Sequence, residues 1–115
     1  MKPGDTFLIP DGIGTHLNCV LALGPDNSLI LCHFTTMHRR SDRTLVIQPG
    51  EHPFFDRETV VRYDQVYICP ESAHEALRRM ITRMMEPLSP ELLKRVKQGA
   101  LDSPQTPDNI KALLR

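Results

Sequence analysis

The sequence predicts an α+β fold, with a small β-barrel or sandwich in residues 1–70 and helices in residues 71–115. Short β-prone runs at close spacing, separated by Gly- and Pro-rich turns, fill the first part. After Pro70 the apolar residues recur at helical spacing instead. We therefore expect a β domain followed by a helical C-terminal extension that packs on it.

Six β-prone runs define the expected sheet. They are Asp5–Pro10, His16–Leu23, Ser28–Phe34, Thr44–Gln48, Thr59–Tyr63 and Gln65–Cys69. The short turn Gly24–Asn27 predicts that the second and third runs pair in antiparallel fashion. Only Asp64 separates the last two runs, so they form either two short strands or one bent strand.

The first expected helix begins at Ser72, which forms a capping box with Glu75, and ends before Pro87. Its apolar positions recur at helical spacing. They are Leu77, Met80, Ile81, Met84 and Met85.

A second helix is expected from Ser89, with Pro90 at its first position and Gly99 near its end. A third, short helix is expected over residues 106–114. The core-facing positions of the second helix are Leu92, Leu93, Val96 and Ala100.

Composition narrows the classes of function. The chain has 14 basic and 14 acidic residues, so only a local patch can attract a polyanion. Cys19, Cys32 and Cys69 lie in separate apolar runs, and this placement predicts buried free thiols in a reducing compartment. No closely paired ligands indicate a metal, and no cofactor is expected. Without a signal segment or long apolar run, the protein is expected to be cytoplasmic.

The polar loop over residues 35–43 holds most of the residues suited to chemistry. His38, Arg39, Arg40 and Arg43 form the densest basic cluster of the chain. Such a cluster on a loop is either a solvated surface or a clamp for phosphate groups.

The order of features in the β half resembles the PemK/MazF family of small toxins, over roughly residues 4–69. The matching features are a Gly-Asp at residues 4–5, a glycine-bearing loop and apolar strand at residues 14–23, a strand ending in Thr-Thr at residues 30–36, a Pro-Phe at residues 53–54 and a β run at residues 60–68. The segment after Pro70 looks like that of a longer, divergent branch.

The resemblance implies a Src-homology-three-like barrel, usually a homodimer, that cuts single-stranded RNA selectively and without a metal. It also implies an antitoxin whose flexible segment covers the RNA groove. The catalytic threonine of the family matches Thr35, with Thr36 beside it. The catalytic arginine has no counterpart, because the equivalent stretch is Thr15-His16-Leu17-Asn18.

Metal-free RNA cleavage needs a base at the 2′-hydroxyl, a cation at the phosphate and an acid at the leaving oxygen. His16 suits the base or the acid, and an arginine of the loop suits the cation. The candidate catalytic residues are His16, Thr35, Thr36 and Arg40. The candidate RNA-binding residues are His38, Arg39, Arg43 and His52. His33, within a strand, and His74, in the first helical turn, are assigned no role.

Ordinary interpretations stand beside these. A histidine at a strand entrance can be simply polar, and threonines are β-prone residues that satisfy turn backbone. The absent arginine also suits a non-catalytic barrel that binds nucleic acid or protein. A third hypothesis places binding in the helical extension, whose methionines at 80, 84 and 85 suit either a core or an adaptable interface.

Overall fold

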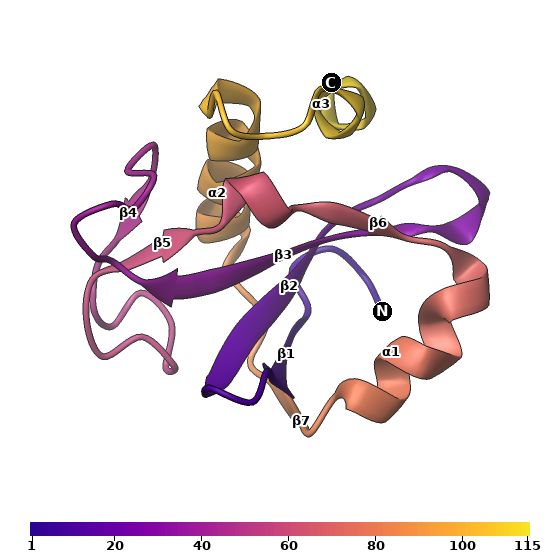
Figure 1. Cartoon of the computed structure of the whole chain (residues 1–115), viewed down its shortest axis with the longest axis horizontal. Coiled ribbons are helices and arrows are strands. Elements are labelled where there is room, and N and C mark those ends of the chain that lie inside the picture. Colours follow the sequence, from indigo (N-terminus) through magenta and orange to yellow (C-terminus); the bar gives the residue numbers. More distant parts are fainter.

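The structure is a computed structural model that describes all residues 1–115. It has the predicted α+β class, with strands and helices arranged as in Figure 1. The strands are β1 Thr6–Pro10, β2 Thr15–Leu23, β3 Leu29–Thr36, β4 Val46–Ile47, β5 Thr59–Val61, β6 Tyr67–Cys69 and β7 Arg83–Met85. The helices are α1 His74–Met80, α2 Pro90–Asp102 and α3 Asp108–Leu114.

The long strand β3 organises a seven-stranded antiparallel sheet. One edge of β3 pairs with β2, and the other pairs with β6 at its start and with β5 at its end. The hydrogen-bonded order is β4-β5-β3-β2-β1-β7, with β6 off this path. The end strands β4 and β7 do not pair with each other, so the sheet is open, and the expected closed barrel is not found. The two-residue β4 pairs with β5 alone.

Two short strands, rather than one bent strand, run along the second edge of β3. A 3₁₀ turn at Tyr63–Gln65 separates β5 from β6. The predicted antiparallel pairing of the second and third strands is confirmed. In this pair Asn18 lies opposite His33 and Cys19 lies opposite Cys32. All three cysteines are free and buried, as predicted.

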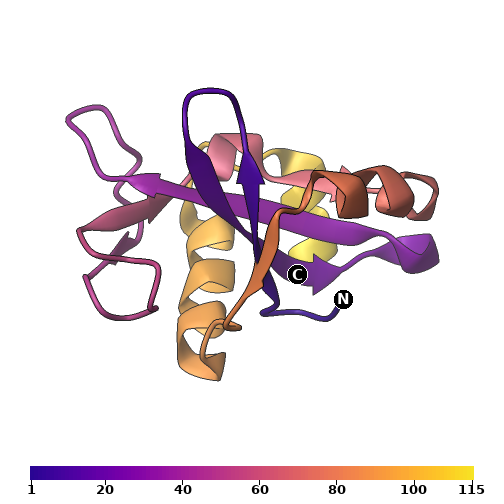
Figure 2. The same cartoon turned by 90° about the horizontal axis from the view of Figure 1, so that it is seen from below.

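The sheet is covered on both faces, because alternate residues of a strand point to opposite sides. Leu17, Cys19 and Leu21 of β2 face α2, in a core that also holds Phe34, Tyr63, Leu92, Val96, Ala100 and Ile110. Val20 faces the other way, toward α1, with Phe7, Leu29, Leu31, Cys69 and Leu77. Figure 2 shows α1 and α2 on opposite sides of the sheet.

The segment around α1 differs from the prediction. Ser72 lies in a 3₁₀ turn, Glu71–Ala73, and no side chain caps α1. The helix ends at Met80, and Met84 and Met85 belong to β7, opposite Phe7 and Thr6 of β1. Helical spacing was therefore the wrong interpretation there, since the open edge of β1 offers backbone hydrogen bonds to an extended chain.

The helix α2 follows the prediction at its start. The Ser89 hydroxyl accepts a hydrogen bond from the Leu92 amide at 3.1 Å, and Pro90 is the first helical residue. Gly99 lies near the end of the helix, as expected, and the helix ends at Asp102. Gly99 lies against the ring of Tyr63, whose hydroxyl donates to the Val96 carbonyl at 2.9 Å.

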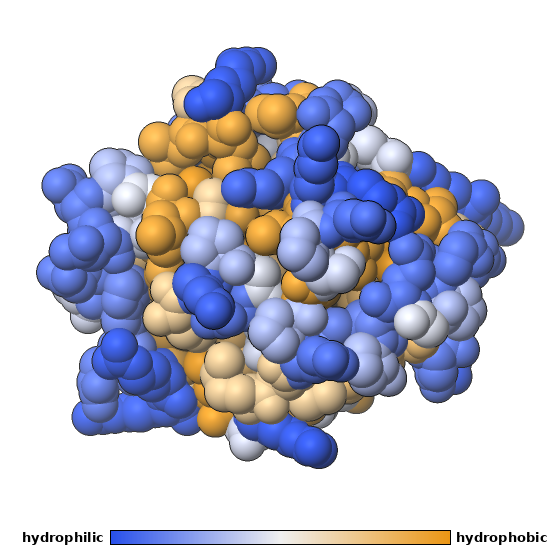
Figure 3. Space-filling view, turned by 180° about the vertical axis from the view of Figure 1, so that it is seen from behind, coloured by the Kyte–Doolittle hydropathy of each residue, from blue (hydrophilic) through white to orange (hydrophobic).

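The outer side of α2 carries an open groove with apolar and basic residues. Its lining is Pro90, Leu93, Lys94, Lys97, Gln98 and Leu101. Figure 3 shows the molecule from behind, where apolar patches alternate with hydrophilic residues. No helix is long and apolar enough to span a membrane.

Candidate functional site

The α1-facing side of the sheet is divided into an apolar half and a polar half. α1 covers the apolar half around Val20 and Leu31. The polar half is formed where His16 and Asn18 of β2 lie beside His33 of β3. Thr35 is two residues beyond His33, so it belongs to the same face.

Two histidines and a carboxylate meet in a hollow of about 190 Å³, which we call the histidine hollow. Its lining is Ile9, Asp11, His16, Asn18, His33 and Gln65. The His16 and His33 rings have their centroids 5.4 Å apart, edge to face.

Both nitrogens of His16 face oxygen atoms. Its Nε2 lies 2.7 Å from Asp11 Oδ2, and its Nδ1 lies 3.2 Å from the Phe34 carbonyl oxygen. A carboxylate and a carbonyl accept hydrogen bonds, and only the imidazolium form of histidine donates from both nitrogens. The geometry therefore suits a protonated His16 that can act as a proton donor.

The loop between β1 and β2 holds Asp11 in place. Asp11 Oδ1 accepts hydrogen bonds from the amides of Ile13 and Gly14, each at 2.9 Å. These backbone bonds are the main reason that the Asp11 pKa lies below its usual value of 3.8. Gly12, at φ +87°, lets the loop close around the carboxylate.

His33 has the opposite electrostatic setting. Burial lowers its pKa from the usual 6.5, and the neighbouring charges of His16 and Arg62 lower it further. Its ring nitrogens make no hydrogen bond within the chain. His33 is therefore neutral at pH 7 and has a free nitrogen that can accept a proton.

A second hollow, the threonine hollow, adjoins the first at His16 and has a volume of about 140 Å³. It is lined by Thr15, His16, Phe34, Thr35, Thr36, Phe54, Phe55, Asp56, Arg57 and Thr59. Three of the predicted catalytic residues, His16, Thr35 and Thr36, thus lie together. The cation here is Arg57, whose Nε lies 3.1 Å from Asp56 Oδ1 at the surface.

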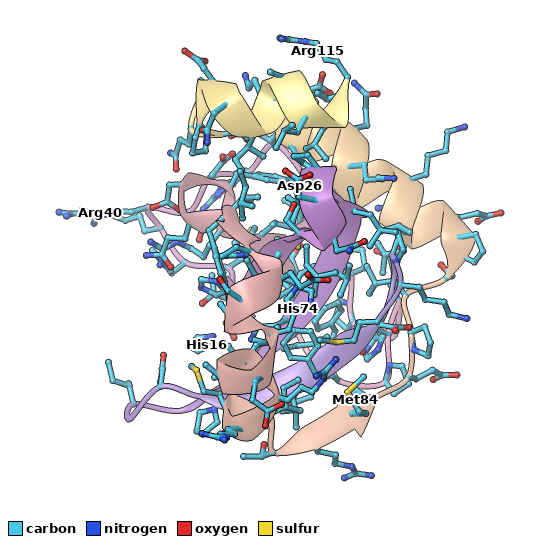
Figure 4. All side chains as sticks on the ribbon, turned by 90° about the vertical axis from the view of Figure 1, so that its right-hand side faces the viewer. His16, Asp26, Arg40, His74, Met84 and Arg115 are labelled. Atoms are coloured by element: carbon cyan, nitrogen blue, oxygen red, sulfur yellow. The ribbon has the colours of Figure 1, made fainter.

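Arg40 lies elsewhere, in a third hollow of about 190 Å³ that we call the arginine hollow. Its lining is His38, Arg40, Ser41, Asp42, Val60, Val61, Arg62, Asp64 and Gln105. The structure does not bring Arg40 together with His16 and Thr35, because the arginine hollow and the threonine hollow share no lining residue. Figure 4 shows His16 and Arg40 on the same side of the molecule, with Arg40 extending into solvent.

The remaining predicted RNA-binding residues are placed differently from one another. Arg39 is exposed and lines none of the hollows, and Arg43 donates to the His38 carbonyl at 3.4 Å. His52 is only 2% exposed. Its Nδ1 accepts from the Phe54 amide at 3.0 Å and its Nε2 lies 2.6 Å from the Glu86 carbonyl oxygen. Both nitrogens of His52 are therefore engaged, and it does not face a ligand.

The C-terminal segment fixes the two loops that border these hollows. Asp42 accepts a hydrogen bond from the Ser103 hydroxyl at 2.5 Å, just after α2. Glu51 pairs with Arg95 of α2, also at 2.5 Å. Contacts from the residues after Pro70 therefore hold the loops of Asp42 and Glu51 in place.

Sequence reasoning missed His33, Asp11 and Arg57. The short turn at residues 24–27 does not reveal His33, because a β-bulge between Val20 and Ala22 shifts the β2–β3 register by one residue. Only with this shift does Asn18 lie opposite His33, which puts His16 and His33 on one face. Nothing in the sequence indicated Arg57, which reaches the site only through an irregular loop. No three His, Cys, Asp or Glu side chains converge closely enough to hold a metal ion.

Comparisons with known proteins bear on the fold. No protein-family model matches the sequence, and neither does any curated protein. Among solved structures, the chain is similar to one described as an endoribonuclease in complex with its cognate antitoxin from a mycobacterial species. The TM-score is 0.60 at 13% sequence identity, over 93% of this chain and 97% of the other. The chain therefore shares its fold with a chain of that structure.

Proposed function

We propose that this protein is a PemK/MazF-like toxin, an endoribonuclease that cuts single-stranded RNA without a metal ion. The observation that carries the proposal is the histidine pair, with His16 and His33 ring centroids 5.4 Å apart on an uncovered face. The fold of the mycobacterial endoribonuclease–antitoxin structure supports the same class. In this proposal the histidines replace the arginine that the family pattern leads one to expect.

The reaction is a transfer of the phosphate from O5′ to O2′. Neutral His33 takes the proton of the 2′-hydroxyl as that oxygen bonds to the adjacent phosphorus. The P–O5′ bond breaks, and His16 gives its proton to the departing 5′ oxygen. The products are a 2′,3′-cyclic phosphate and a 5′-hydroxyl, with the enzyme's proton moved from one histidine to the other.

The threonine hollow supplies the rest of the machinery in this proposal. The Thr35 and Thr36 hydroxyls orient the phosphate, and the Arg57 guanidinium stabilises its developing charge. Asp11 orients His16 and gives up part of that contact when RNA arrives.

The basic residues beyond this centre bind the flanking strand. His38, Arg40 and Arg43 border the path of the RNA away from the histidines. Three neutralised phosphates on a single strand give a slope of log affinity against log salt of about −2. The salt dependence of RNA binding thus reports how many of these cations act.

An antitoxin is the proposed partner, with a flexible segment that covers the histidine and threonine hollows. A homodimer is proposed with it. Light scattering of the isolated protein tests the dimer, which should have twice the 13.1 kDa of one chain.

Incubation of purified protein with a long single-stranded RNA in EDTA tests the activity. General acid and base catalysis is typically worth about 10²–10⁴ in rate, so His16→Ala and His33→Ala should each lose at least about 100-fold. His74→Ala is the matched control, because this histidine lies on α1 and lines none of the three hollows. Equal cleavage by all three variants, or intact RNA with wild type, would refute the proposal.

A non-catalytic binding module is the second candidate, and one observation favours it. Both nitrogens of His16 are already engaged, by Asp11 and by the Phe34 carbonyl. This function predicts that wild type binds RNA without cutting it, and that His16→Ala leaves the affinity unchanged.

A further inference from the structure

The arginine hollow is not used by the proposed phosphate transfer, yet it borders the catalytic face. The backbone amide of Arg62 donates to the His33 carbonyl at 3.0 Å, so the hollow begins one strand away from the histidine pair. Its volume of about 190 Å³ is below the roughly 300–1,000 Å³ of sites for drug-sized ligands. A hollow of this size suits a single planar group.

Part of the hollow is rigid. Arg62 Nε and Nη2 each lie 3.0 Å from an oxygen of Asp64, a two-point contact that fixes both side chains. Asp42 is fixed by the hydroxyls of Ser103 and Thr44, at 2.5 and 2.6 Å. The hollow is therefore formed before any ligand arrives.

Gln105 lines the hollow with a side-chain amide that makes no hydrogen bond within the chain. Its backbone amide donates to the Ser103 hydroxyl at 3.1 Å, which fixes the start of the side chain. Its side-chain oxygen and nitrogen make no hydrogen bond within the chain, and the residue is exposed. The amide has both a donor and an acceptor to offer.

The mixture of groups favours a nucleobase over a phosphate. A phosphate site would bring cations and donors alone, whereas this hollow also contains the Asp42 and Asp64 carboxylates. Carboxylate and amide oxygens accept hydrogen bonds from exocyclic amino groups, which adenine, cytosine and guanine have and uracil lacks. Arg40 can stack its planar guanidinium on the base.

We propose that the arginine hollow is a base-recognition subsite, in which the Gln105 amide turns its nitrogen toward the carboxylates of Asp42 and Asp64 and its oxygen toward the base. That oxygen accepts a hydrogen bond from the amino group of a base next to the cleaved position, and it disfavours uracil, which offers a carbonyl there instead. The inference rests on the proposed endoribonuclease function and gives that function its sequence preference. It also assigns a role to the C-terminal segment, because Gln105 lies between α2 and α3. A good pair of base-edge hydrogen bonds discriminates by about tenfold or more.

Sequencing the cut ends of a random-sequence RNA pool tests the proposal. Wild type should disfavour uracil by about tenfold at one position beside the cut. Gln105→Ala should lose this bias, because the contact that favours amino-bearing bases is gone. Asn109→Ala is the matched control, an exposed amide on α3 that lines no hollow, and should keep the bias. A bias unchanged in Gln105→Ala, or no bias in wild type, would overturn the subsite.

A binding measurement separates this inference from the proposed function. Two 2′-O-methyl oligonucleotides that cannot be cut, one cytosine-rich and one uracil-rich, are titrated into wild type and Gln105→Ala. Preference of wild type for the cytosine oligonucleotide, lost in the variant, upholds the subsite even if wild type cuts no RNA. Equal affinities of wild type for the two oligonucleotides refute the subsite, whatever the cleavage assay shows.

Discussion

Replacing Gly99 with alanine tests how α2 is docked on the sheet. In an exposed helix interior this change stabilises by about 1 kcal/mol, because alanine is the better helix former. Here a Cβ atom at position 99 would lie 2.9 Å from Tyr63 Cζ and still closer to the Tyr63 hydroxyl oxygen. The ring must move, and Tyr63 is fully buried.

The magnitude follows from what the displaced ring loses. Overpacking a core typically costs about 1–3 kcal/mol. Separating the Tyr63 hydroxyl from the Val96 carbonyl leaves a buried donor unpaired, at about 1–3 kcal/mol. After the gain in helix propensity, we expect Gly99→Ala to lower the free energy of unfolding by about 2–4 kcal/mol, or Tm by roughly 10 °C.

Urea denaturation followed by circular dichroism measures this difference. Lys94→Ala, at an exposed position of the same helix, is the control and should change stability by less than about 0.5 kcal/mol. The double variant Gly99→Ala with Tyr63→Phe should recover part of the loss, because the closest atom is gone. Gly99→Ala with wild-type or higher stability would refute the packing of α2 against Tyr63.

Further predictions concern the histidine pair, the fixed loop and the C-terminal segment. His33 must be neutral to act as a base, and burial keeps its pKa below 6.5. The kcat/KM of RNA cleavage should therefore fall as the pH drops below 6.5, and any residual activity of His33→Gln should lack this fall. Ser103→Ala should lower stability at pH 7 by about 1–2 kcal/mol through the lost bond to Asp42. Burial raises the pKa of Asp42 in the folded state, but hydrogen bonds from Ser103 and Thr44 outweigh burial, so this pKa lies below its usual value of 3.8. The stability difference between wild type and Ser103→Ala, measured by urea denaturation, should therefore be present above pH 3.8 and shrink as the pH falls below it. A chain truncated after Glu86 should show no cooperative melting transition, because Leu92, Val96 and Ala100 complete the main core.

The positions of the first six strands along the chain could be predicted because local signals and tertiary structure agree. The turn at residues 24–27 predicts the antiparallel pairing of β2 with β3, and the structure has this pairing. The register could not be predicted, because a β-bulge between Val20 and Ala22 shifts it by one residue. The Ser89 cap and the Pro90 start of α2 are equally local, and both are found.

The errors arise where distant contacts decide the outcome. Met84 and Met85 fit a helix by spacing, but the Leu8 carbonyl of β1 accepts the Thr82 amide at 3.0 Å and draws the chain into a strand. Gly99 lies near the helix end, as expected, but the sequence did not show that it also permits the close approach of Tyr63. Neither contact can be predicted from the residues next to it in the sequence.

The candidate site was predictable only in part for the same reason. His16, Thr35 and Thr36 lie on neighbouring strands, and they line one hollow. His52 was a candidate RNA-binding residue, but it is buried, and its Nε2 lies 2.6 Å from the Glu86 carbonyl oxygen, 34 residues away in the chain. The loop arginines seemed close to Thr35 in sequence, whereas the loop turns Arg40 toward Asp64 and Gln105.

The most direct test of the account compares an RNA with a DNA of the same sequence, each incubated with wild-type protein in EDTA. The 2′-hydroxyl is the nucleophile in the proposed reaction, so the RNA should be cut to fragments with 2′,3′-cyclic phosphate and 5′-hydroxyl ends while the DNA stays intact. An RNA that remains whole, a DNA that is cut equally, or fragments with 5′-phosphate ends would contradict the two-histidine mechanism.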